Sequence, residues 1–258
     1  MNLPAVNLSA LLDDLVPLIR AAGEQVMAVY ATDFDVERKG DASPVTQADQ
    51  QAETLILAGL ARLAPEIPVV AEEAAAAGHV PEVGARFWLV DPLDGTKEFI
   101  SRNGEFTVNI ALVEDGAPVL GLVLAPALGR LFGGARGLGA WVDDAQGRRP
   151  IATRSPPPSG LTVVASRSHG DEGALDAFLA GRSVAARTNA GSSLKLCLVA
   201  AGEADVYPRL GRTMEWDIAA GDAVLRAAGG RTQTLDGAPL RYGKPGFDNP
   251  HFAAWGRP

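Results

Sequence analysis

The chain has 258 residues, of which 47% are hydrophobic and 21% are charged, and its formal net charge is −8. This balance is that of a globular protein and excludes disordered and fibrous classes. The acidic charge argues against nucleic-acid polymers and anionic membranes as partners, because phosphate backbones are bound by clustered lysine and arginine. It does not exclude a phosphorylated small molecule, since carboxylates that gather around a divalent cation form a site that attracts phosphate.

The sequence carries no signal for export, for a disulfide or for zinc. The single cysteine, Cys197, lies in the apolar run 196–199 and is expected to be a buried thiol, and the three histidines lack zinc-ligand spacing. Residues 1–14 have neither the basic nor the apolar region of a signal peptide, and no apolar run approaches the roughly 18 residues of a membrane-spanning helix. We expect a cytoplasmic protein without a transmembrane segment.

The N-terminal part predicts helices followed by a largely antiparallel sheet. Apolar residues at helical spacing predict a helix over 8–30, which Pro17 is expected to kink or split, and a second helix over 49–63. Short apolar runs predict four strands, over 67–70, 87–90, 106–113 and 118–124. The residues 114–116 between the last two strands indicate a hairpin.

A linker-like segment follows at 154–160, because its three consecutive prolines cannot continue a helix or a central strand. We place a domain boundary there, between an N-terminal α+β domain, residues 1–155, and a C-terminal α/β domain, residues 156–258. Beyond the boundary, strands and helices alternate, which implies a parallel or mixed sheet covered by helices. The expected strands are 161–165 and 204–207, and the expected helices are 171–179, 192–201 and 215–228.

Two aspartates stand at the end of the predicted strand 87–90. Asp91 and Asp94 flank a turn in which Gly95 permits a conformation that a Cβ would obstruct, so that both carboxylates and the Leu93 carbonyl can point to one place. Three hard oxygen ligands suit Mg²⁺, which completes its shell with water and substrate phosphate. Thr96 would begin the next helix, and the unpaired amides of a helix start bind phosphate oxygens.

Other interpretations of these acidic residues are open at this point. Asp-Pro-x-Asp-Gly is also a favourable turn sequence. The aspartyl-phosphate phosphatase motif has its two aspartates two residues apart, whereas Asp91 and Asp94 are three apart, which disfavours a covalent aspartate nucleophile. Glu72, Glu73 and Asp217 also fit the first turns of helices, where acidic side chains are common.

Three motifs in this order resemble the signatures of the inositol monophosphatase superfamily: AEE at 71–73, DPLDGT at 91–96 and WDIAAG at 216–221. Longer strings are similar to its CysQ branch, the bacterial 3′(2′),5′-bisphosphate nucleotidases: 91–113, 166–169, 191–209 and 216–225. The resemblance extends over nearly the whole chain. It implies a layered αβαβα sandwich of the sugar-phosphatase type, α+β to α/β in class, with a largely antiparallel N-terminal sheet, a mixed C-terminal sheet, helices on both, and an active site between the two domains.

The resemblance also implies roles for individual residues. The metal ligands would be Glu72, Asp91, the Leu93 carbonyl, Asp94 and Asp217, holding two or three Mg²⁺ ions. Asp49 and Thr96 would position and help deprotonate a metal-bound water, with Glu72 as the third catalytic residue. Substrate contacts would come from Leu93, Asp94, Gly95, Thr96, Ser166, His169, Gly191, Lys195 and Asp217. Three positions depart from the usual pattern without removing a ligand: Ala71, Arg212 and Ile218.

The implied reaction is hydrolysis of the 3′-phosphate of 3′-phosphoadenosine 5′-phosphate to AMP and phosphate, by direct attack of metal-bound water and without a phosphoenzyme. This activity supports sulfate assimilation. Two alternatives are a phosphatase for inositol monophosphate or another sugar phosphate, and a catalytically silent metabolite-binding protein. The resemblance leaves open a monomer or a homodimer, inhibition by lithium or sodium, and peripheral association with the inner membrane.

Overall fold

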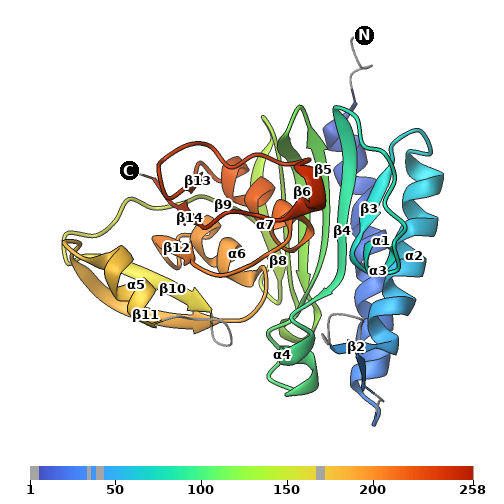
Figure 1. Ribbon diagram of the computed structural model, residues 1–258, viewed down its shortest axis with the longest axis horizontal. Helices are drawn as coiled ribbons and strands as arrows, with labels where there is room; N and C mark the ends of the chain where they lie inside the picture. Colours follow the sequence, from blue (N-terminus) through green and yellow to red (C-terminus); the bar gives the residue numbers. More distant parts are fainter. Residues whose placement is uncertain (1–5, 34–35, 39–43, 167–171, 258) are drawn as a thin grey trace.

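The computed structural model describes residues 6–33, 36–38, 44–166 and 172–257. Its elements stack in alternating layers: a helix pair, a seven-stranded sheet, a second helix pair, a five-stranded sheet and one more helix (Figure 1). This is the αβαβα sandwich that the resemblance implied.

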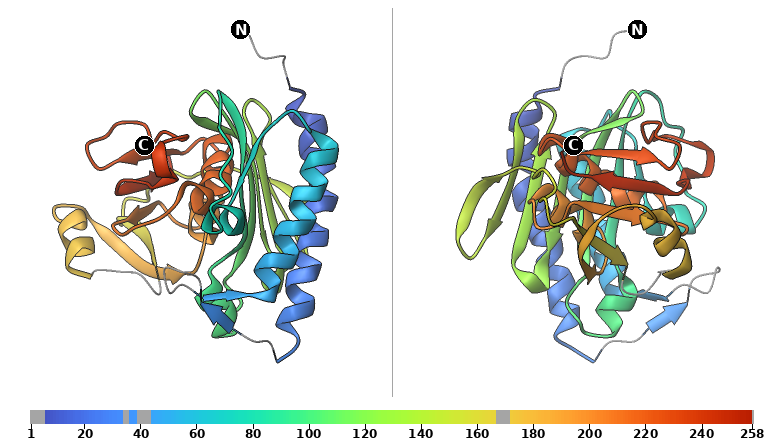
Figure 2. Two further views of the ribbon diagram at one scale, coloured as in Figure 1. Left: turned by 45° about the vertical axis from the view of Figure 1, so that its right-hand side comes forward. Right: turned by 90° about the vertical axis from the view of Figure 1, so that its left-hand side faces the viewer.

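The outer helix pair covers one face of the seven-stranded sheet. It consists of α1 (Leu8–Tyr30) and α2 (Gln47–Leu63), which lie side by side in the left view of Figure 2. Helix α1 continues through Pro17 as one helix, so the expected split does not occur. Pro17 and Asp13 are both exposed, so the Asp13 carbonyl, which lacks its intrahelical donor, can be satisfied by water. Between the two helices, β1 (Val36–Arg38) and β2 (Pro44–Thr46) form a small antiparallel pair.

The seven-stranded sheet has the order β3-β4-β5-β6-β7-β8-β9, and only the β3–β4 pair is parallel. Its strands are β3 (Val69–Ala71), β4 (Arg86–Asp94), β5 (Thr107–Glu114), β6 (Ala117–Ala125), β7 (Arg130–Ala135), β8 (Gly139–Asp144) and β9 (Gly147–Ile151). The predicted hairpin at 114–116 is confirmed, whereas β7 to β9 had no prediction. Two short helices, α3 (Glu72–Ala76) and α4 (Thr96–Ile100), follow β3 and β4, and a 3-10 turn, η1 (Pro126–Leu128), follows β6.

The five-stranded sheet is mixed, as predicted, with the order β11-β10-β12-β14-β13. Its strands are β10 (Leu161–Ser166), β11 (Val184–Ala190), β12 (Val206–Arg209), β13 (Arg231–Thr234) and β14 (Phe252–Trp255). The C-terminal helices are α5 (Glu172–Leu179), α6 (Leu194–Ala200) and α7 (Glu215–Ala227), and a 3-10 turn, η2 (Pro245–Phe247), precedes β14.

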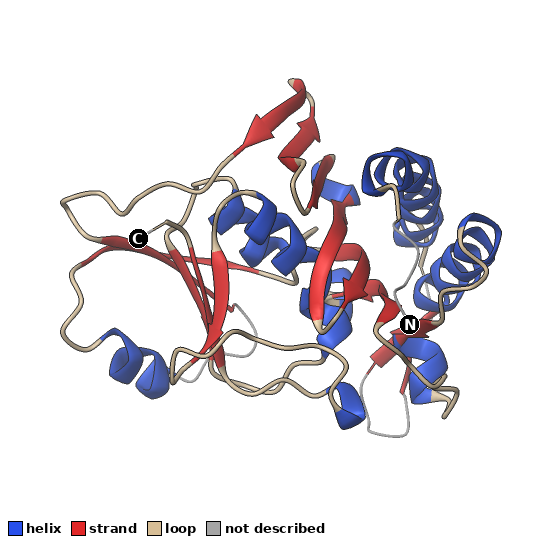
Figure 3. Ribbon diagram, turned by 90° about the horizontal axis from the view of Figure 1, so that it is seen from above, coloured by secondary structure: helices blue, strands red, loops and turns tan. Residues whose placement is uncertain are grey.

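Helix α7 lies between the two sheets, which Figure 3 shows from above. Glycines in the first sheet let it approach closely: a Cβ on Gly121 would lie 2.3 Å from the Ala220 carbonyl oxygen, and one on Gly134 would lie 3.0 Å from Val224 Cα. This contact holds the N-terminal end of α7, where Asp217 lies, close to the strands that carry Asp91 and Asp94.

The side chains between the two sheets form one continuous hydrophobic cluster. Phe87 and Leu89 from the first sheet belong to it together with Val224 and Phe252 from beyond residue 155. Within the described ranges, no helix is both long and apolar enough to cross a bilayer.

Candidate active site

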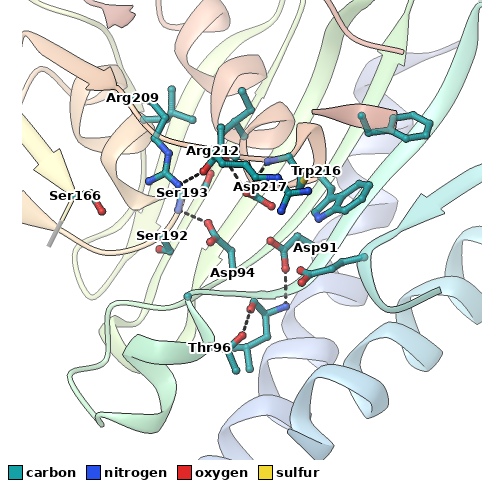
Figure 4. A pocket seen from close by; sticks show the side chains of 18 of the residues that line it. Asp91, Asp94, Thr96, Ser166, Ser192, Ser193, Arg209, Arg212, Trp216 and Asp217 are labelled. Carbon is teal, nitrogen blue, oxygen red and sulfur yellow. Dashed lines mark hydrogen bonds between the residues drawn. The ribbon is translucent and has the colours of Figure 1, made fainter. Parts of the chain in front are cut away.

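A cavity of about 820 Å³ opens where the two sheets and α7 meet (Figure 4). Its wall comes from the start of α3, the end of β4 with the start of α4, the loop between β11 and α6, the segment from β12 to the start of α7, and the turn η2. These segments are far apart in the sequence. The cavity therefore exists only because the sheets stack.

The end of β4 forms the acidic side of the cavity. Pairing with β5 is regular up to Asp91 opposite Asn109, and it resumes with Asp94 opposite Thr107, so that one extra residue bulges from β4. Asp91 Oδ1 accepts a hydrogen bond from the Leu93 amide at 3.0 Å, which keeps the bulge closed. As a result both aspartates point toward the same part of the cavity, as Figure 4 shows.

Gly95 and Thr96 complete the turn after the bulge. Gly95 has φ +91°, a left-handed conformation that favours glycine, and it is the N-cap residue that precedes α4. The Thr96 hydroxyl donates to the Leu93 carbonyl oxygen at 3.5 Å. Both residues line the cavity, as the sequence predicts for phosphate-binding amides.

Asp217 faces the β4 aspartates from the first turn of α7. Its Oδ2 accepts hydrogen bonds from the Thr213 hydroxyl at 2.6 Å and from the Met214 amide at 2.9 Å, so it also caps the helix. One carboxylate oxygen each from Asp217, Asp91 and Glu72 lie within 4.8 Å of one another. Asp217 therefore caps α7 and belongs to the acidic cluster at the same time.

Burial and mutual repulsion raise the pKa of the clustered aspartates. The pKa of Asp91 is raised well above its ordinary value, first by burial and then by Glu72, Asp94 and Asp217. Burial, followed by the charge of Asp217, raises the pKa of Asp94 to about 8. Burial and then Glu72 raise the pKa of Asp217 to about 6. Carboxylates that repel one another at such short range fit a divalent cation, because its charge removes the repulsion and their oxygens are its preferred ligands.

Lys195 is almost completely buried, at 3% exposure, beside this cluster. Its Nζ donates to the carbonyl oxygens of Ser192 at 2.6 Å and Ala190 at 3.3 Å, and it lies 5.3 Å from the centre of the Tyr207 ring. Burial lowers its pKa to about 8, against the opposing charge of Asp94. The structure thus places this predicted substrate contact at the cavity, with its ammonium group bonded to the loop before α6.

The loop between β11 and α6 touches the acidic cluster through its backbone. The Ser193 amide donates to Asp94 Oδ2 at 2.5 Å. The Gly191 amide instead donates to Glu105 Oε2 at 2.9 Å, and Gly191 is not among the described residues that line the cavity. Ser192 and Ser193 line it instead.

The remaining predicted residues differ in position. Ser166, at the end of β10, lines the cavity. Asp49 does not, among the described residues; its Oδ2 accepts hydrogen bonds from the Thr46 amide at 2.8 Å and hydroxyl at 2.7 Å and so caps α2. His169 lies outside the described residues.

Sequence reasoning missed several residues of the cavity wall. Arg209 donates to the Arg212 carbonyl oxygen at 2.5 Å, and Arg212 Nε donates to Asp248 Oδ1 at 3.0 Å. Trp216 and Phe247 pack with ring centres 6.1 Å apart. Arg209 lies in the string 191–209 and Trp216 beside Asp217, which could have indicated both; no motif indicated Phe247.

The sequence profile of the inositol monophosphatase family matches residues 7–255. The chain belongs to this family. Among its relatives, a protein named 3′(2′),5′-bisphosphate nucleotidase CysQ from Escherichia coli strain K12 is 47% identical over 94% of this chain and 98% of its own length. The protein of the same name from Buchnera aphidicola is 40% identical over 90% of this chain and 87% of its own length.

Solved structures of the family have the same fold. The crystal structure of CysQ from Bacteroides thetaiotaomicron has a TM-score of 0.82 and 34% identity, and covers 98% of this chain and 100% of that one. An inositol monophosphatase from Anabaena has a TM-score of 0.76 and 28% identity, and covers 97% of this chain and 92% of that one.

Proposed function

We propose that this protein is a magnesium-dependent 3′(2′),5′-bisphosphate nucleotidase that hydrolyses the 3′-phosphate of 3′-phosphoadenosine 5′-phosphate to AMP and phosphate, in support of sulfate assimilation. The observation that carries the proposal is the carboxylate cluster at the cavity, in a chain that is nearly half identical to proteins named for this activity. The site would lie between an N-terminal metal-binding domain, residues 1–155, and a C-terminal domain, residues 156–258.

Five groups would hold two or three Mg²⁺ ions: the side chains of Glu72, Asp91, Asp94 and Asp217 and the carbonyl of Leu93. Magnesium, when bound, supplies positive charge to the phosphoryl group and activates water for attack. The chain's own part is to hold these oxygens in place before substrate arrives. The β4 bulge does so for Asp91 and Asp94, and the Thr213 hydroxyl and Met214 amide do so for Asp217.

The residues after the bulge would bind and orient the phosphate. The amides of Gly95, the N-cap residue of α4, and of Thr96, its first residue, would bind phosphate oxygens, because a helix start leaves amides without intrahelical partners. Thr96 would position the attacking water. Asp49, which caps α2 and does not line the cavity among the described residues, would help to take the proton of this water as the family resemblance implies. Such positioning, together with charge stabilisation, supplies most of the catalysis of phosphoryl transfer.

Cationic side chains of the cavity would recognise the rest of the nucleotide. Arg209 and Arg212 bring positive charge to the cavity from the segment between β12 and α7, and the charge of Lys195 acts on Asp94. These cations complement a second anionic group on the substrate. A volume of about 820 Å³ is within the range of small-molecule sites, roughly 300–1,000 Å³. Ser166 and His169 would complete the nucleotide contacts, and His169 lies outside the described residues.

The test is a comparison of three substrates with purified protein and Mg²⁺. Phosphate release from 3′-phosphoadenosine 5′-phosphate, inositol 1-phosphate and fructose 1,6-bisphosphate should give the highest kcat/KM for the nucleotide. Preference for a sugar phosphate would overturn the substrate while leaving the metal site intact. Binding of the nucleotide without turnover of any substrate would instead indicate a metabolite-binding protein.

The metal assignment has its own test. Asp91→Asn should lower kcat at least about a hundredfold, since the cluster loses a ligand and a charge at its centre. Wild-type Tm should rise by about 5 °C when free Mg²⁺ is about a hundred times its Kd, and chelator should reverse both this rise and the activity. Asp143→Asn, in the exposed ion pair with Arg20, is the control and should keep both the activity and the rise in Tm with Mg²⁺. An Asp91→Asn enzyme with wild-type activity would refute the assignment.

A further inference from the structure

We infer that Glu53, in α2, is a positioning residue that holds Glu72 in the orientation needed for cation binding. The inference rests on the proposed function for the identity of the cation, and on the hydrogen bonds of α2 and α3 for its mechanism. No motif singled out Glu53, and it does not line the cavity among the described residues.

Glu53 binds the start of α3 with both of its carboxylate oxygens. Oε2 accepts a hydrogen bond from the Glu73 amide and Oε1 accepts one from the Ala74 amide, each at 2.8 Å. The residue is only 6% exposed. These two amides belong to the first turn of α3, where a helix has no carbonyl partners of its own. Glu53 therefore serves as the cap of a helix that begins about twenty residues later in the chain.

Helix α3 has little packing of its own. It has five residues, none of them fully buried; Ala74 and Ala75 are partly buried against the two cores, and the residue before the helix, Ala71, makes no side-chain hydrogen bond as a cap. A helix this short is not stable by itself, because its few backbone hydrogen bonds do not offset the conformational entropy lost in nucleation. The two hydrogen bonds from its first-turn amides to Glu53 therefore help to fix how the chain turns from β3 into α3.

Glu72 is the residue at that turn. Ala71, just before it, pairs with Val90 in the sheet, and Glu73, just after it, donates its amide to Glu53. The backbone of Glu72 is therefore held on both sides, by the sheet and by the Glu53 carboxylate. A carboxylate that must meet Asp91 and Asp217 within 4.8 Å depends on such support, because small displacements of a ligand weaken metal binding.

The cap from Glu53 costs folding free energy, because it buries an ionisable carboxyl group that a neutral cap would not bury. Burial raises the pKa of Glu53 to about 7, against the lowering effect of the two amide hydrogen bonds. A serine at position 71 could cap the same helix without burying a charge, since Ala71 has φ −121° and ψ 148°, the extended conformation of an N-cap residue. The rigid connection to α2, rather than capping alone, is what Glu53 adds.

The test measures Mg²⁺ binding directly, by isothermal titration calorimetry, alongside stability in urea and steady-state kinetics. Glu53→Gln keeps the size of the side chain but replaces one acceptor with an amide group that faces a backbone donor. Its Kd for Mg²⁺ should rise by about tenfold or more, the usual effect of losing a group that orients a metal ligand. The kcat should fall at low Mg²⁺ and recover at high Mg²⁺, while KM for the nucleotide at saturating Mg²⁺ stays unchanged.

A matched control separates positioning from general destabilisation. Asp205 is another buried carboxylate that accepts a backbone amide, from Thr162, and it also pairs with Arg154, away from the cavity. Asp205→Asn should lose stability and leave the Kd for Mg²⁺ unchanged. Adding Ala71→Ser to Glu53→Gln should restore part of the lost stability but not the Mg²⁺ affinity, because the serine supplies a local cap without the connection to α2.

Each outcome decides the inference. If Glu53→Gln loses stability but binds Mg²⁺ within twofold of wild type, Glu53 is structural only and the inference is wrong. If Glu53→Gln does not fold, Glu53→Asp, which keeps the charge on a shorter side chain, carries the same expectation and the same refutation. A wild-type protein that binds no Mg²⁺ would overturn the proposed function as well, so the two failures are distinguishable.

Discussion

Replacing Lys195 by methionine would show what a buried lysine does at the edge of the acidic cluster. Methionine has a similar length and fills the same space without a charge. The substitution removes the hydrogen bonds from Nζ to the carbonyl oxygens of Ser192, at 2.6 Å, and Ala190, at 3.3 Å. It also removes the ammonium group that lies 5.3 Å from the centre of the Tyr207 ring.

The expected loss of stability follows from these contacts. A hydrogen bond that involves a charged group contributes roughly 1.5–3 kcal/mol, and the longer bond to Ala190 contributes less. The loss is offset in part because methionine needs no desolvation, a cost that is visible in the lowering of the lysine pKa to about 8 by burial. We expect the free energy of unfolding to fall by about 2–4 kcal/mol.

The loop should loosen as well, and Asp94 with it. Ser193 follows Ser192 and donates its amide to Asp94 Oδ2, so a displaced loop leaves Asp94 without this partner. Lys195→Met should therefore lower kcat in addition to raising KM. Urea denaturation gives the stability and steady-state kinetics give the two constants. Lys97→Met, at an exposed cation on the same cavity, is the control and should keep stability within about 0.5 kcal/mol.

An unchanged free energy of unfolding for Lys195→Met, together with a raised KM and an unchanged kcat, would refute this reasoning. Lys195 would then be a substrate contact alone, as the family resemblance implies, and its bonds to the loop would be incidental.

Three further predictions concern residues away from the cluster. Gly121→Val should destabilise the fold by about 3 kcal/mol and reduce activity, because even its Cβ would lie 2.3 Å from the Ala220 carbonyl oxygen and push α7 from the sheet. Cys197 is fully buried, and burial raises its pKa far above the ordinary value, so a thiol reagent should label it only after denaturation. A hydrogen bond from Arg86 lowers the pKa of Glu114 below its ordinary 4.5. This interaction therefore stabilises the fold above about pH 4.5 and is lost as the pH falls further. In Glu114→Gln the free energy of unfolding should depend less steeply on pH at the acid end, as urea denaturation at several pH values would show.

Each of these has a contrary result that is easy to recognise. Gly84, where a Cβ would meet nothing within 4 Å, is the control for Gly121, and equal losses from Gly84→Ala and Gly121→Val would contradict the close contact of α7. Labelling of native Cys197 at the rate of a free thiol would show that the core opens. If the free energy of unfolding of Glu114→Gln falls with acid pH in parallel with that of the wild type, other carboxylates are responsible for the loss of stability at acid pH.

Local patterns in the sequence determined the elements that depend on near neighbours. The apolar periodicity of 8–30 and 49–63 predicted α1 and α2, and the turn residues 114–116 predicted the β5–β6 hairpin. The acidic motifs placed Asp94 at a strand end and Asp217 at a helix start, because turn and capping chemistry is a matter of a few adjacent residues. These features require no knowledge of what packs against them. The sequence predicts Asp91 just past the strand, whereas it lies within β4, which continues across the bulge to Asp94.

Strands that rely on distant partners were not predictable in this way. Strand β7, with the sequence RLFGGA, contains two glycines that disfavour a strand by themselves. Gly133 is needed there because a Cβ would lie 2.2 Å from the Trp141 ring on β8, and Gly134 because α7 packs over it. Pairing with β6 and β8 makes this segment a strand, and only the assembled sheet supplies both neighbours.

The tertiary structure alone decided which side chains meet at the site. The motifs named Glu72, Asp91 and Asp217, but the 4.8 Å cluster exists because α7 packs on the sheet beside β4. Three features carry no local signal: the burial of Lys195, the position of Arg209 and Arg212 at the cavity, and the cap that Glu53 gives to α3. Each depends on contacts between segments that are distant along the chain. Residue types and turn chemistry are properties of the sequence, whereas burial, proximity and the resulting pKa shifts arise only when the layers stack.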